Sequence, residues 1–86
     1  MDEIWSVYLV ECRTKDIYVG ISKDVDERIK QHNAGQACRY TKFRGPVRFL
    51  YAEPCDNYLQ ARRREKEIKR FSRKKKLALI KKDLSP

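Results

Sequence analysis

The sequence predicts an α+β fold in which a small three-stranded antiparallel sheet is flanked by helices, in the order ββαβαα. Two observations carry this prediction. Aliphatic, β-branched and aromatic residues are concentrated in three short runs, and the segments between and after these runs space their apolar residues three and four apart. The length of 86 residues and the hydrophobic content of 41% suit a single domain with a modest core, over residues 1–86.

Residues 4–12 and 17–21 are predicted to form a hairpin, because only the short polar segment 13–16 separates them. Gly20 suits a strand position that another group approaches closely. Tyr8 and Tyr18 lie on the same sheet face only if the numbers of two residues that pair across the hairpin sum to an even value. A three-residue loop over 14–16 satisfies this condition. A two-residue turn at 14–15 would place the two rings on opposite faces.

A helix is predicted after the hairpin, because Val25, Ile29 and His32 are spaced four and three residues apart. Asp24 can cap its first turn, with Glu27 at the third helical position. Residues 33–35, Asn-Ala-Gly, tolerate the left-handed conformation that ends a helix.

A polar, basic loop over residues 36–46 is predicted next, followed by a third strand over residues 47–53 that Pro54 ends. Alternation is expected to place Val47, Phe49 and Tyr51 on one face of this strand and Leu50 and Ala52 on the other.

Two helices are predicted for the C-terminal third. Asn57 begins the first, which runs to about Phe71, and Ser72 can cap the second. The expected inward positions are Leu59, Ala61, Ile68 and Phe71 in the first, and Leu77, Ile80 and Leu84 in the second.

The positive charge of the chain is concentrated in this C-terminal third. The chain carries a net charge of +9, with 21 Lys and Arg against 12 Asp and Glu. Residues 57–82 alone carry a net charge of +10, so the rest of the chain nets −1. This clustering favours a polyanionic partner, and a solvated basic face without a ligand is the alternative.

The remaining composition excludes several classes of protein. A charged fraction of 38% and the lack of a long apolar run exclude a membrane-embedded chain. Cys12, Cys38 and Cys55 show no Cys-x-x-Cys spacing, so neither a disulfide framework nor a zinc site is indicated. Residues 1–3 lack the basic start of a secretory signal, and we expect a reducing, cytoplasmic location.

Several short motifs occur in the predicted elements. The first strand carries Ser6-Val7-Tyr8, the second carries Tyr18-Val19-Gly20, and the helix after them carries Arg28 and His32. Glu65 lies in the helix after the third strand, and residues 31–35 read Gln-His-Asn-Ala-Gly. Over residues 5–80 this ordered set resembles the GIY-YIG nuclease family, and in particular its small stand-alone bacterial members. Ser6 stands where the family has glycine, and no residue clearly matches the asparagine that many members carry after the glutamate.

The resemblance implies an endonuclease that hydrolyses DNA phosphodiester bonds with Mg²⁺ or Mn²⁺. It implies that Tyr8, Tyr18, Arg28, His32 and Glu65 form the site, with Glu65 as the metal ligand. These residue types suit the chemistry, because an arginine fork can hold two phosphate oxygens and Mg²⁺ needs few protein carboxylates. For Tyr18 to act as a general base, nearby Arg28 and the metal would have to favour its phenolate.

Nucleic acid is therefore the expected partner of the basic residues: DNA, with RNA also possible, and no membrane. The expected phosphate contacts are Lys23, Arg62, Arg63, Lys69, Arg70, Arg73, Lys74, Lys75 and Lys76. No separate module for base recognition is visible, so we expect structure-dependent or weakly selective cleavage, with a protein partner as one source of specificity.

Other readings of the same residues stay open. The tyrosines could be packing residues, Arg28 and Glu65 could form a surface ion pair, and His32 could be structural. At the level of function, the alternatives are a non-catalytic nucleic-acid-binding module of the same fold, acting with a repair or RNA partner, and a basic surface that binds acidic membranes or proteins.

Overall fold

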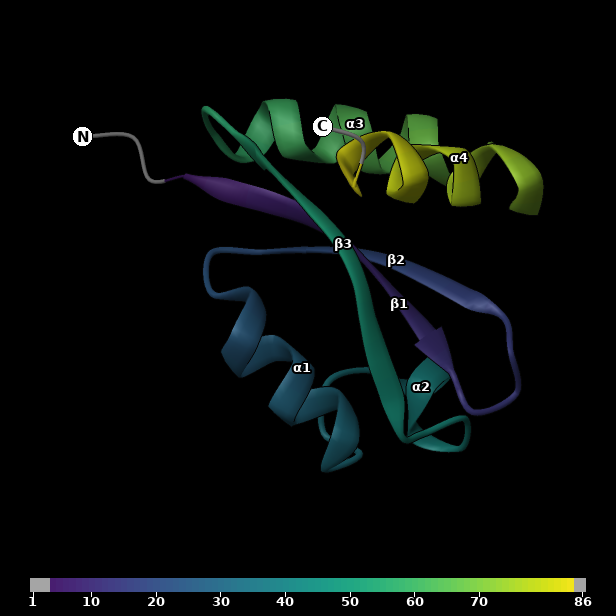
Figure 1. Cartoon of the computed structure of the whole chain (residues 1–86). Helices are drawn as coiled ribbons and strands as arrows, with labels where there is room; N and C mark the ends of the chain where they lie inside the picture. Colours follow the sequence, from purple (N-terminus) through teal and green to yellow (C-terminus); the bar gives the residue numbers. More distant parts are fainter. Residues whose placement is uncertain (1–3, 85–86) are drawn as a thin grey trace.

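The computed structural model of the chain describes residues 4–84, and the side chains of residues 4–81. It contains three strands and four helices (Figure 1). They are β1 (Trp5–Cys12), β2 (Ile17–Ser22), α1 (Val25–Asn33), α2 (Arg39–Lys42), β3 (Val47–Cys55), α3 (Tyr58–Lys69) and α4 (Arg73–Leu84). The predicted order ββαβαα is confirmed, with the short helix α2 added inside the segment predicted as a loop.

The strands form one antiparallel sheet in the order β2-β1-β3, so β1 is central and β2 and β3 are edges. The β1–β2 hairpin pairs Tyr8 with Gly20 and Val10 with Tyr18. The residue numbers in each pair sum to an even value, so the side chains of Tyr8 and Tyr18 lie on the same face of the sheet. A hairpin loop of three residues produces this register. That loop is residues 13–15, one residue earlier than predicted, because the Cys12 N–H donates to the Asp16 carbonyl at 2.9 Å.

Helices cover both faces of the sheet (Figure 1). On one face, Val7, Leu9 and Val19 pack with Tyr51, with Ala61 and Ile68 of α3, and with Leu79 and Ile80 of α4. On the other face, Tyr8, Val10 and Cys12 pack with Val47 and with Val25 and Ile29 of α1. The catalytic candidates of β1 and β2 therefore point to the α1 face, whereas Glu65 belongs to a helix that packs on the opposite face.

Strand β3 differs from its prediction in two respects. Leu9 pairs with Tyr51 and Val10 pairs with Phe49, so Leu50 is the extra residue of a β-bulge. The bulge turns Tyr51 to the α3 face while Val47 stays on the α1 face, so the single alternation predicted for this strand was wrong. Pro54 does not end the strand, because β3 is an edge strand and its missing N–H disturbs no ladder.

Helix α1 begins and ends at the predicted residues. The Asp24 side chain accepts a hydrogen bond from the Glu27 N–H at 3.1 Å and so caps the first turn. The chain leaves the helix through Gly35, whose φ of +75° is the left-handed conformation that glycine adopts readily.

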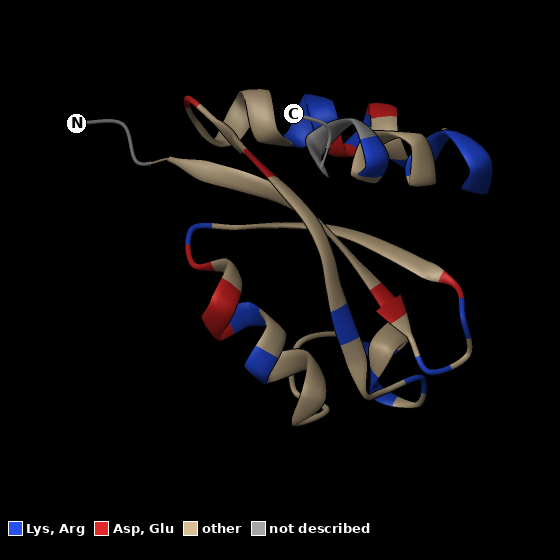
Figure 2. Cartoon of the chain, in the orientation of Figure 1, with Lys and Arg blue, Asp and Glu red and all other residues tan. Residues whose placement is uncertain are grey.

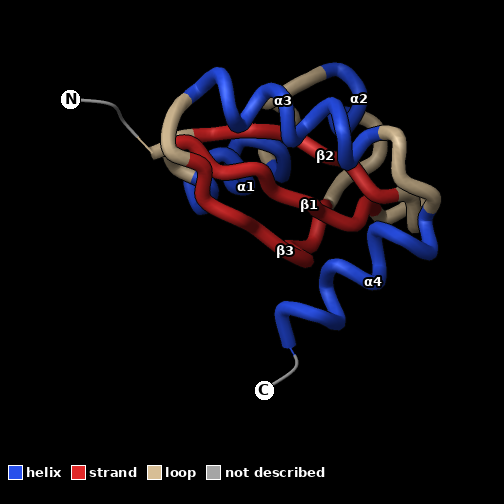
Figure 3. Tube along the Cα trace, turned by 90° about the horizontal axis from the view of Figure 1, so that it is seen from above, coloured by secondary structure: helices blue, strands red, loops and turns tan. Residues whose placement is uncertain are grey.

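Helices α3 and α4 are capped by Asn57 and Ser72, as predicted: each side chain accepts from a backbone N–H three residues on. Ala61 and Ile68 are buried, but Leu59 is 59% exposed and its predicted inward position was wrong. In α4, Ile80 packs on the core with Leu79, and Leu77 is at the surface. The side chain of Leu84 lies outside the described residues. Viewed from above, α4 extends away from the sheet beyond β3 (Figure 3).

Over residues 4–84, no helix is both long enough and apolar enough to cross a bilayer.

Candidate functional site

The site is centred on Tyr8, whose ring lies over Gly20 of the neighbouring strand. A Cβ atom at residue 20 would lie 2.6 Å from the Tyr8 hydroxyl and 2.7 Å from its Cζ, a separation that no side chain tolerates. Glycine is therefore required at this position for the ring of Tyr8 to cross the strand. The prediction that something approaches Gly20 closely is confirmed, and the approaching group is a candidate catalytic side chain.

His32 holds the hydroxyl of Tyr8 from α1. Its Nε2 lies 2.7 Å from the Tyr8 hydroxyl, its Nδ1 lies 2.7 Å from Thr41 Oγ1, and its side chain is fully buried. Thr41 in turn lies 3.4 Å from Cys38 Sγ. In one of the two tautomers that fit these contacts, Tyr8 O–H donates to Nε2, Nδ1–H donates to Thr41, and Thr41 O–H donates to the thiol of Cys38.

Tyr18 completes an aromatic cluster with these two residues. Its ring centroid lies 6.4 Å from that of Tyr8 and 5.2 Å from that of His32. On its other side, the ring of Tyr40 from α2 lies 5.6 Å away. Tyr18 is less buried than Tyr8, so it is the tyrosine that a water molecule or a substrate can reach.

Burial sets the protonation of these groups. It raises the pKa of Tyr8, and the adjacent Arg28 guanidinium offsets this only in part. Burial and the neighbouring thiol of Cys38 raise the pKa of Tyr18 well above its usual range, again with a smaller opposing effect of Arg28. Burial, with help from Arg28, lowers the pKa of His32. Both phenols are therefore protonated and the imidazole is neutral near pH 7.

Arg28 is held by two hydrogen bonds from its terminal nitrogens. Nη1 donates to Gln31 Oε1 at 3.0 Å and Nη2 donates to the Ala37 carbonyl at 3.2 Å. Its Nε is buried and has no hydrogen-bond partner among the described residues. The Arg28 guanidinium thus keeps one unused donor beside the two tyrosines.

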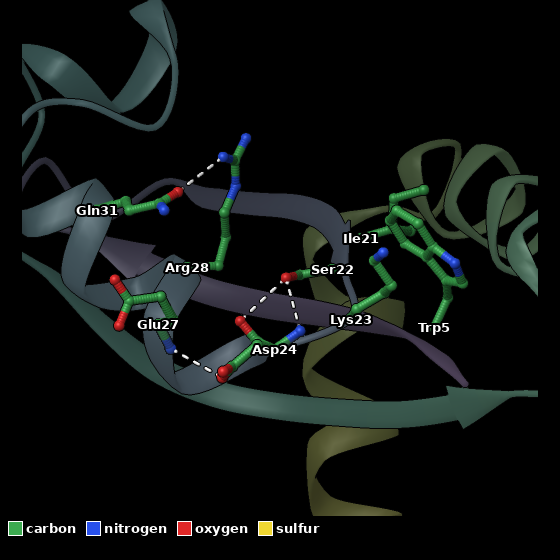
Figure 4. A pocket seen from close by; sticks show the side chains of 8 residues that line it. All are labelled: Trp5, Ile21, Ser22, Lys23, Asp24, Glu27, Arg28 and Gln31. Carbon is green, nitrogen blue, oxygen red and sulfur yellow. Dashed lines mark hydrogen bonds between the residues drawn. The ribbon is translucent and has the colours of Figure 1, made fainter. Parts of the chain in front are cut away.

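A hollow of about 440 Å³ opens next to Arg28, between the start of α1 and the ends of β1 and β2 (Figure 4). It is lined by Trp5, Ile21, Ser22, Lys23, Asp24, Glu27, Arg28 and Gln31. Lys23, a predicted phosphate contact, lies at this rim with its Nζ 5.5 Å from the centroid of the Trp5 ring. The hollow gives a substrate access to Arg28.

Glu65 is 6% exposed although it is a carboxylate on the surface helix α3. Its two oxygens pair with Arg62 at 3.4 Å and with Lys69 at 3.3 Å, and in the described part of the chain it makes no ion pair with Arg28. Its negative charge makes a small contribution to the raised pKa of Tyr8, after those of burial, Arg28 and Cys38. The surface ion pair between Arg28 and Glu65 that the sequence left open is therefore not formed.

A metal ion would have to be held almost entirely by water at this place. Within residues 4–84, no three His, Cys, Asp or Glu side chains lie together as ligands for one ion. Glu65 alone fits Mg²⁺ or Mn²⁺, because such ions can bind through one carboxylate and keep most of their waters. Arg62 and Lys69 have long side chains that are about half exposed, so they can move aside.

The predicted nucleic-acid-binding residues follow α3 and α4, where Figure 2 shows Lys and Arg gathered. Arg63 and Arg70 line, with Lys66 and Lys75, a hollow of about 550 Å³ between the two helices. Arg73 and Lys76 line a second hollow that also includes Tyr40. Lys74 is exposed, whereas Arg62 and Lys69 are engaged with Glu65. Most of the predicted basic residues thus line one of two hollows, and two of them, Arg62 and Lys69, pair with the carboxylate of Glu65.

Nothing in the sequence analysis indicated that α2 contributes to the site. The segment predicted as a loop contains Cys38, Tyr40 and Thr41. Thr41 contacts His32, Tyr40 contacts Tyr18, and Cys38 contacts Thr41, because α2 folds back toward α1 and β2. No spacing rule signals such contacts, because they join residues of different elements.

The fold and the site together agree with a comparison against protein families. A family model described as the GIY-YIG catalytic domain matches residues 4–78. The chain therefore belongs to the GIY-YIG family, a family of nucleases, and the resemblance inferred from the sequence is confirmed.

Within this family the chain is similar to UPF0213 proteins. It is 49% identical to a UPF0213 protein of Staphylococcus saprophyticus over 86% of this chain and 90% of the relative. It is 47% identical to UPF0213 proteins of Staphylococcus aureus, over 87% and 92%. The solution NMR structure of the UPF0213 protein BH0048 from Bacillus halodurans superposes with a TM-score of 0.58 at 38% identity, covering 91% of this chain and 83% of that one.

Proposed function

We propose that the protein is a divalent-metal-dependent endonuclease that hydrolyses phosphodiester bonds in DNA, in a structure-dependent or weakly selective manner. The observation that carries the proposal is that Tyr8 and Tyr18 lie on one sheet face, with ring centroids 6.4 Å apart, and that Arg28, which lines an open hollow, affects the pKa of both. Such a cluster of perturbed groups beside an open hollow is typical of a catalytic site.

Each residue has a role that its surroundings support. Arg28 binds the non-bridging oxygens of the scissile phosphate through its planar fork, in exchange for its present partners Gln31 and Ala37. Tyr18, the more accessible tyrosine, first loses its phenolic proton to solvent, and its phenolate oxygen then accepts a proton from the attacking water. Tyr8 stays protonated and donates to His32, which fixes the position of the two rings.

Loss of the phenolic proton of Tyr18 needs a local positive charge, because the phenol is protonated near pH 7. Binding of the phosphate draws Arg28 toward the reacting atoms, and a Glu65-bound cation would add a second positive charge there. When bound, the Mg²⁺ or Mn²⁺ ion neutralises charge on the phosphate and on the leaving oxygen. Glu65 supplies the one carboxylate that holds the ion, once Arg62 and Lys69 release it.

The basic hollows of α3 and α4 provide the contact with the DNA backbone. Arg63, Arg70 and Lys75 are free of the site itself, and their charges would replace counterions condensed on DNA. Within residues 4–84, all strands and helices belong to one small domain, so we expect contacts with the phosphate backbone to outweigh the reading of base edges.

A second candidate function is a nucleic-acid-binding module without cleavage, acting with a repair or RNA partner. The observation that favours it is the pairing of both Glu65 oxygens with cations, which leaves the carboxylate already neutralised. If these pairs persist with DNA bound, the metal has no ligand.

The experiment that separates the two is cleavage of labelled single-stranded, duplex, flapped and branched DNA with Mg²⁺, Mn²⁺ or a chelator. The informative variants are Arg28→Ala and Glu65→Gln. Asp26→Asn is the matched control, because Asp26 is an exposed carboxylate that lines neither the hollow at Arg28 nor the basic hollow of α3 and α4. We expect metal-dependent cleavage that both site variants lose by at least about 100-fold and that the control keeps. Salt-sensitive binding without cleavage of any substrate would establish the second candidate instead.

A further inference from the structure

The segment 36–46, which links α1 to β3, contacts the site but has no role in the reaction proposed above. It places Thr41 against His32 and Tyr40 against Tyr18. Its composition is unlike that of the surrounding loops, because it carries three cations, Arg39, Lys42 and Arg44, and no acidic residue. An anionic ligand that reaches Tyr18 therefore meets a positively charged rim on this side.

Phe43 is the most exposed large apolar side chain of the described residues, at 72%. It follows α2 directly, and the ammonium of Lys42 lies 5.5 Å from the centroid of its ring. The ring stands at the edge of a hollow of about 480 Å³. This hollow is lined by His32, Asn33, Ala34, Gly35, Lys42, Phe43, Gly45 and Pro46.

The ring is presented on a fixed backbone. After Phe43, the Arg44 N–H donates to the Thr41 carbonyl at 3.1 Å, and the Arg44 carbonyl accepts from the Arg13 N–H at 2.8 Å. The Arg13 side chain donates in addition to the Gly45 carbonyl at 2.9 Å. The hairpin turn thus anchors the chain on the far side of Phe43, and an exposed ring on an anchored loop contributes to binding without a large ordering cost.

From these observations we infer that Phe43 and Lys42 form a subsite for an unpaired nucleobase of the polynucleotide substrate, on the His32 side of the candidate site. The base stacks on the Phe43 ring and Lys42 pairs with the phosphate attached to it. An exposed aromatic ring within a cationic surface is the usual means of binding single-stranded nucleic acid. A base in a duplex cannot use this ring, because both of its faces are already stacked on neighbouring base pairs.

The inference rests on the proposed nucleic-acid substrate but not on cleavage. It specifies the substrate further: a single-stranded or locally unpaired segment on the His32 side of the site. A protein partner is a weaker interpretation. Of the three cations of the segment only Arg44 pairs with an acid among the described residues, Asp16 at 3.8 Å, and a lone exposed ring is a small apolar contact.

The test is equilibrium binding by fluorescence anisotropy, in chelator, so that no cleavage occurs. The probes are a short labelled oligodeoxyuridylate, the corresponding oligouridylate and a mixed-sequence duplex of the same length. The variants are Phe43→Ala and Phe43→Trp, with Phe49→Ala as the matched control, since Phe49 is 50% exposed on the edge strand β3. Because Phe43 is exposed, its replacement leaves the thermal midpoint unchanged.

We expect Phe43→Ala to weaken binding of the single-stranded probes by about fivefold or more and to leave duplex binding unchanged. Phe43→Trp restores the affinity, and Phe49→Ala leaves all three affinities as they are. If Phe43→Ala loses affinity for only the DNA single strand or only the RNA single strand, the subsite is supported and the sugar that it accepts is identified. An equal loss for duplex and single strand, or no loss, overturns the inference while metal-dependent cleavage can still stand. If the unmodified protein binds none of the probes, the nucleic-acid substrate itself is wrong.

Discussion

The hydroxyl of Tyr8 lies 2.7 Å from Nε2 of His32, and this contact joins the central strand of the sheet to the first helix. It exists because the chain provides no side chain at residue 20 and because α1 brings its last turn over the same sheet face. Two residues that are 24 positions apart thereby become one hydrogen-bonded unit. The predictions below follow from this unit and from the charges around it.

Gly20→Ala should break the contact between Tyr8 and His32. The added Cβ would lie 2.6 Å from the Tyr8 hydroxyl, so the ring has to move. Forcing a methyl group into such a space costs about 1–3 kcal/mol of unfolding free energy. Gly45→Ala is the matched control, because its Cβ meets only ordinary contacts, at 3.6 Å from the Thr41 carbonyl.

Urea unfolding of the two glycine variants provides the stability comparison, and the NMR signals of the imidazole report the Tyr8 contact directly. His32 is the only histidine of the chain, so its signals need no assignment. If Gly20→Ala left both the unfolding free energy and the imidazole signals unchanged, the close packing of Tyr8 over residue 20 would be wrong.

His32 should make the protein less stable as the solution becomes mildly acidic. The folded protein disfavours the imidazolium, so the pKa of His32 is lower in the folded chain than in the unfolded chain. The unfolded state therefore binds the extra proton first, and stability falls as the pH drops below the unfolded pKa of about 6.5. The slope is at most about 1.4 kcal/mol per pH unit and ends below the folded pKa.

The measurement is the free energy of unfolding in urea between about pH 7.5 and about pH 5.5, a window in which a histidine titrates and ordinary carboxylates do not. His32→Gln, which keeps a polar side chain without a proton to bind, is expected to flatten this dependence. A wild-type stability that is constant over the window, or that rises toward acid pH, would contradict the prediction.

Tyr18 should give the cleavage reaction a rising pH profile. Since the pKa of Tyr18 is well above its usual range, each pH unit increases the phenolate fraction about tenfold throughout the neutral range. If Tyr18 accepts the proton from water, log kcat/KM rises with pH with a slope near one. Tyr18→Phe should lower the rate by about 100-fold or more and remove this slope.

The control for this profile is Tyr58→Phe, since Tyr58 is 50% exposed and packs on Trp5 away from the tyrosine pair. It is expected to retain both the rate and the slope. A Tyr18→Phe variant that is slow but has the same slope would assign the proton transfer to another group.

The basic hollow between α3 and α4 should make binding of DNA strongly dependent on salt. Arg70 and Lys75 line this hollow and neither pairs with Glu65. Replacing one of them by alanine removes about one phosphate contact and lowers the slope of log Kd against log salt by about one. Lys30→Ala, on the exposed side of α1, is expected to leave the slope unchanged. An affinity that is insensitive to salt would rule out these helices as the backbone contact.

Much of the fold could be predicted from the sequence because its signals are local. The caps at Asp24, Asn57 and Ser72 and the glycine that ends α1 are settled by residues three positions apart or fewer. An odd number of residues in the hairpin loop followed from the positions of Tyr8 and Tyr18, once both side chains were required on one face of the sheet. The family motifs also lie in short segments, and they belong to these local signals.

The errors all concern contacts between elements. The bulge at Leu50 arises where β3 pairs with β1, so the alternation along the strand alone did not reveal it. Leu59 has helical spacing but lies on the part of α3 that the sheet does not cover. α2 is too short for a periodic signal, and its contacts with His32 and Tyr18 depend on how the chain folds back.

The sequence by itself determined the order of the elements, the family, the basic character of the C-terminal helices and the residue types of the site, because each of these depends on neighbouring residues or on composition. Only the tertiary structure decided that His32 is buried against Tyr8, that Glu65 pairs with Arg62 and Lys69, and that burial raises the pKa of both phenols. The physical reason is that burial and charge at a side chain are set by residues distant in the chain, and these meet only when the sheet and its helices pack together.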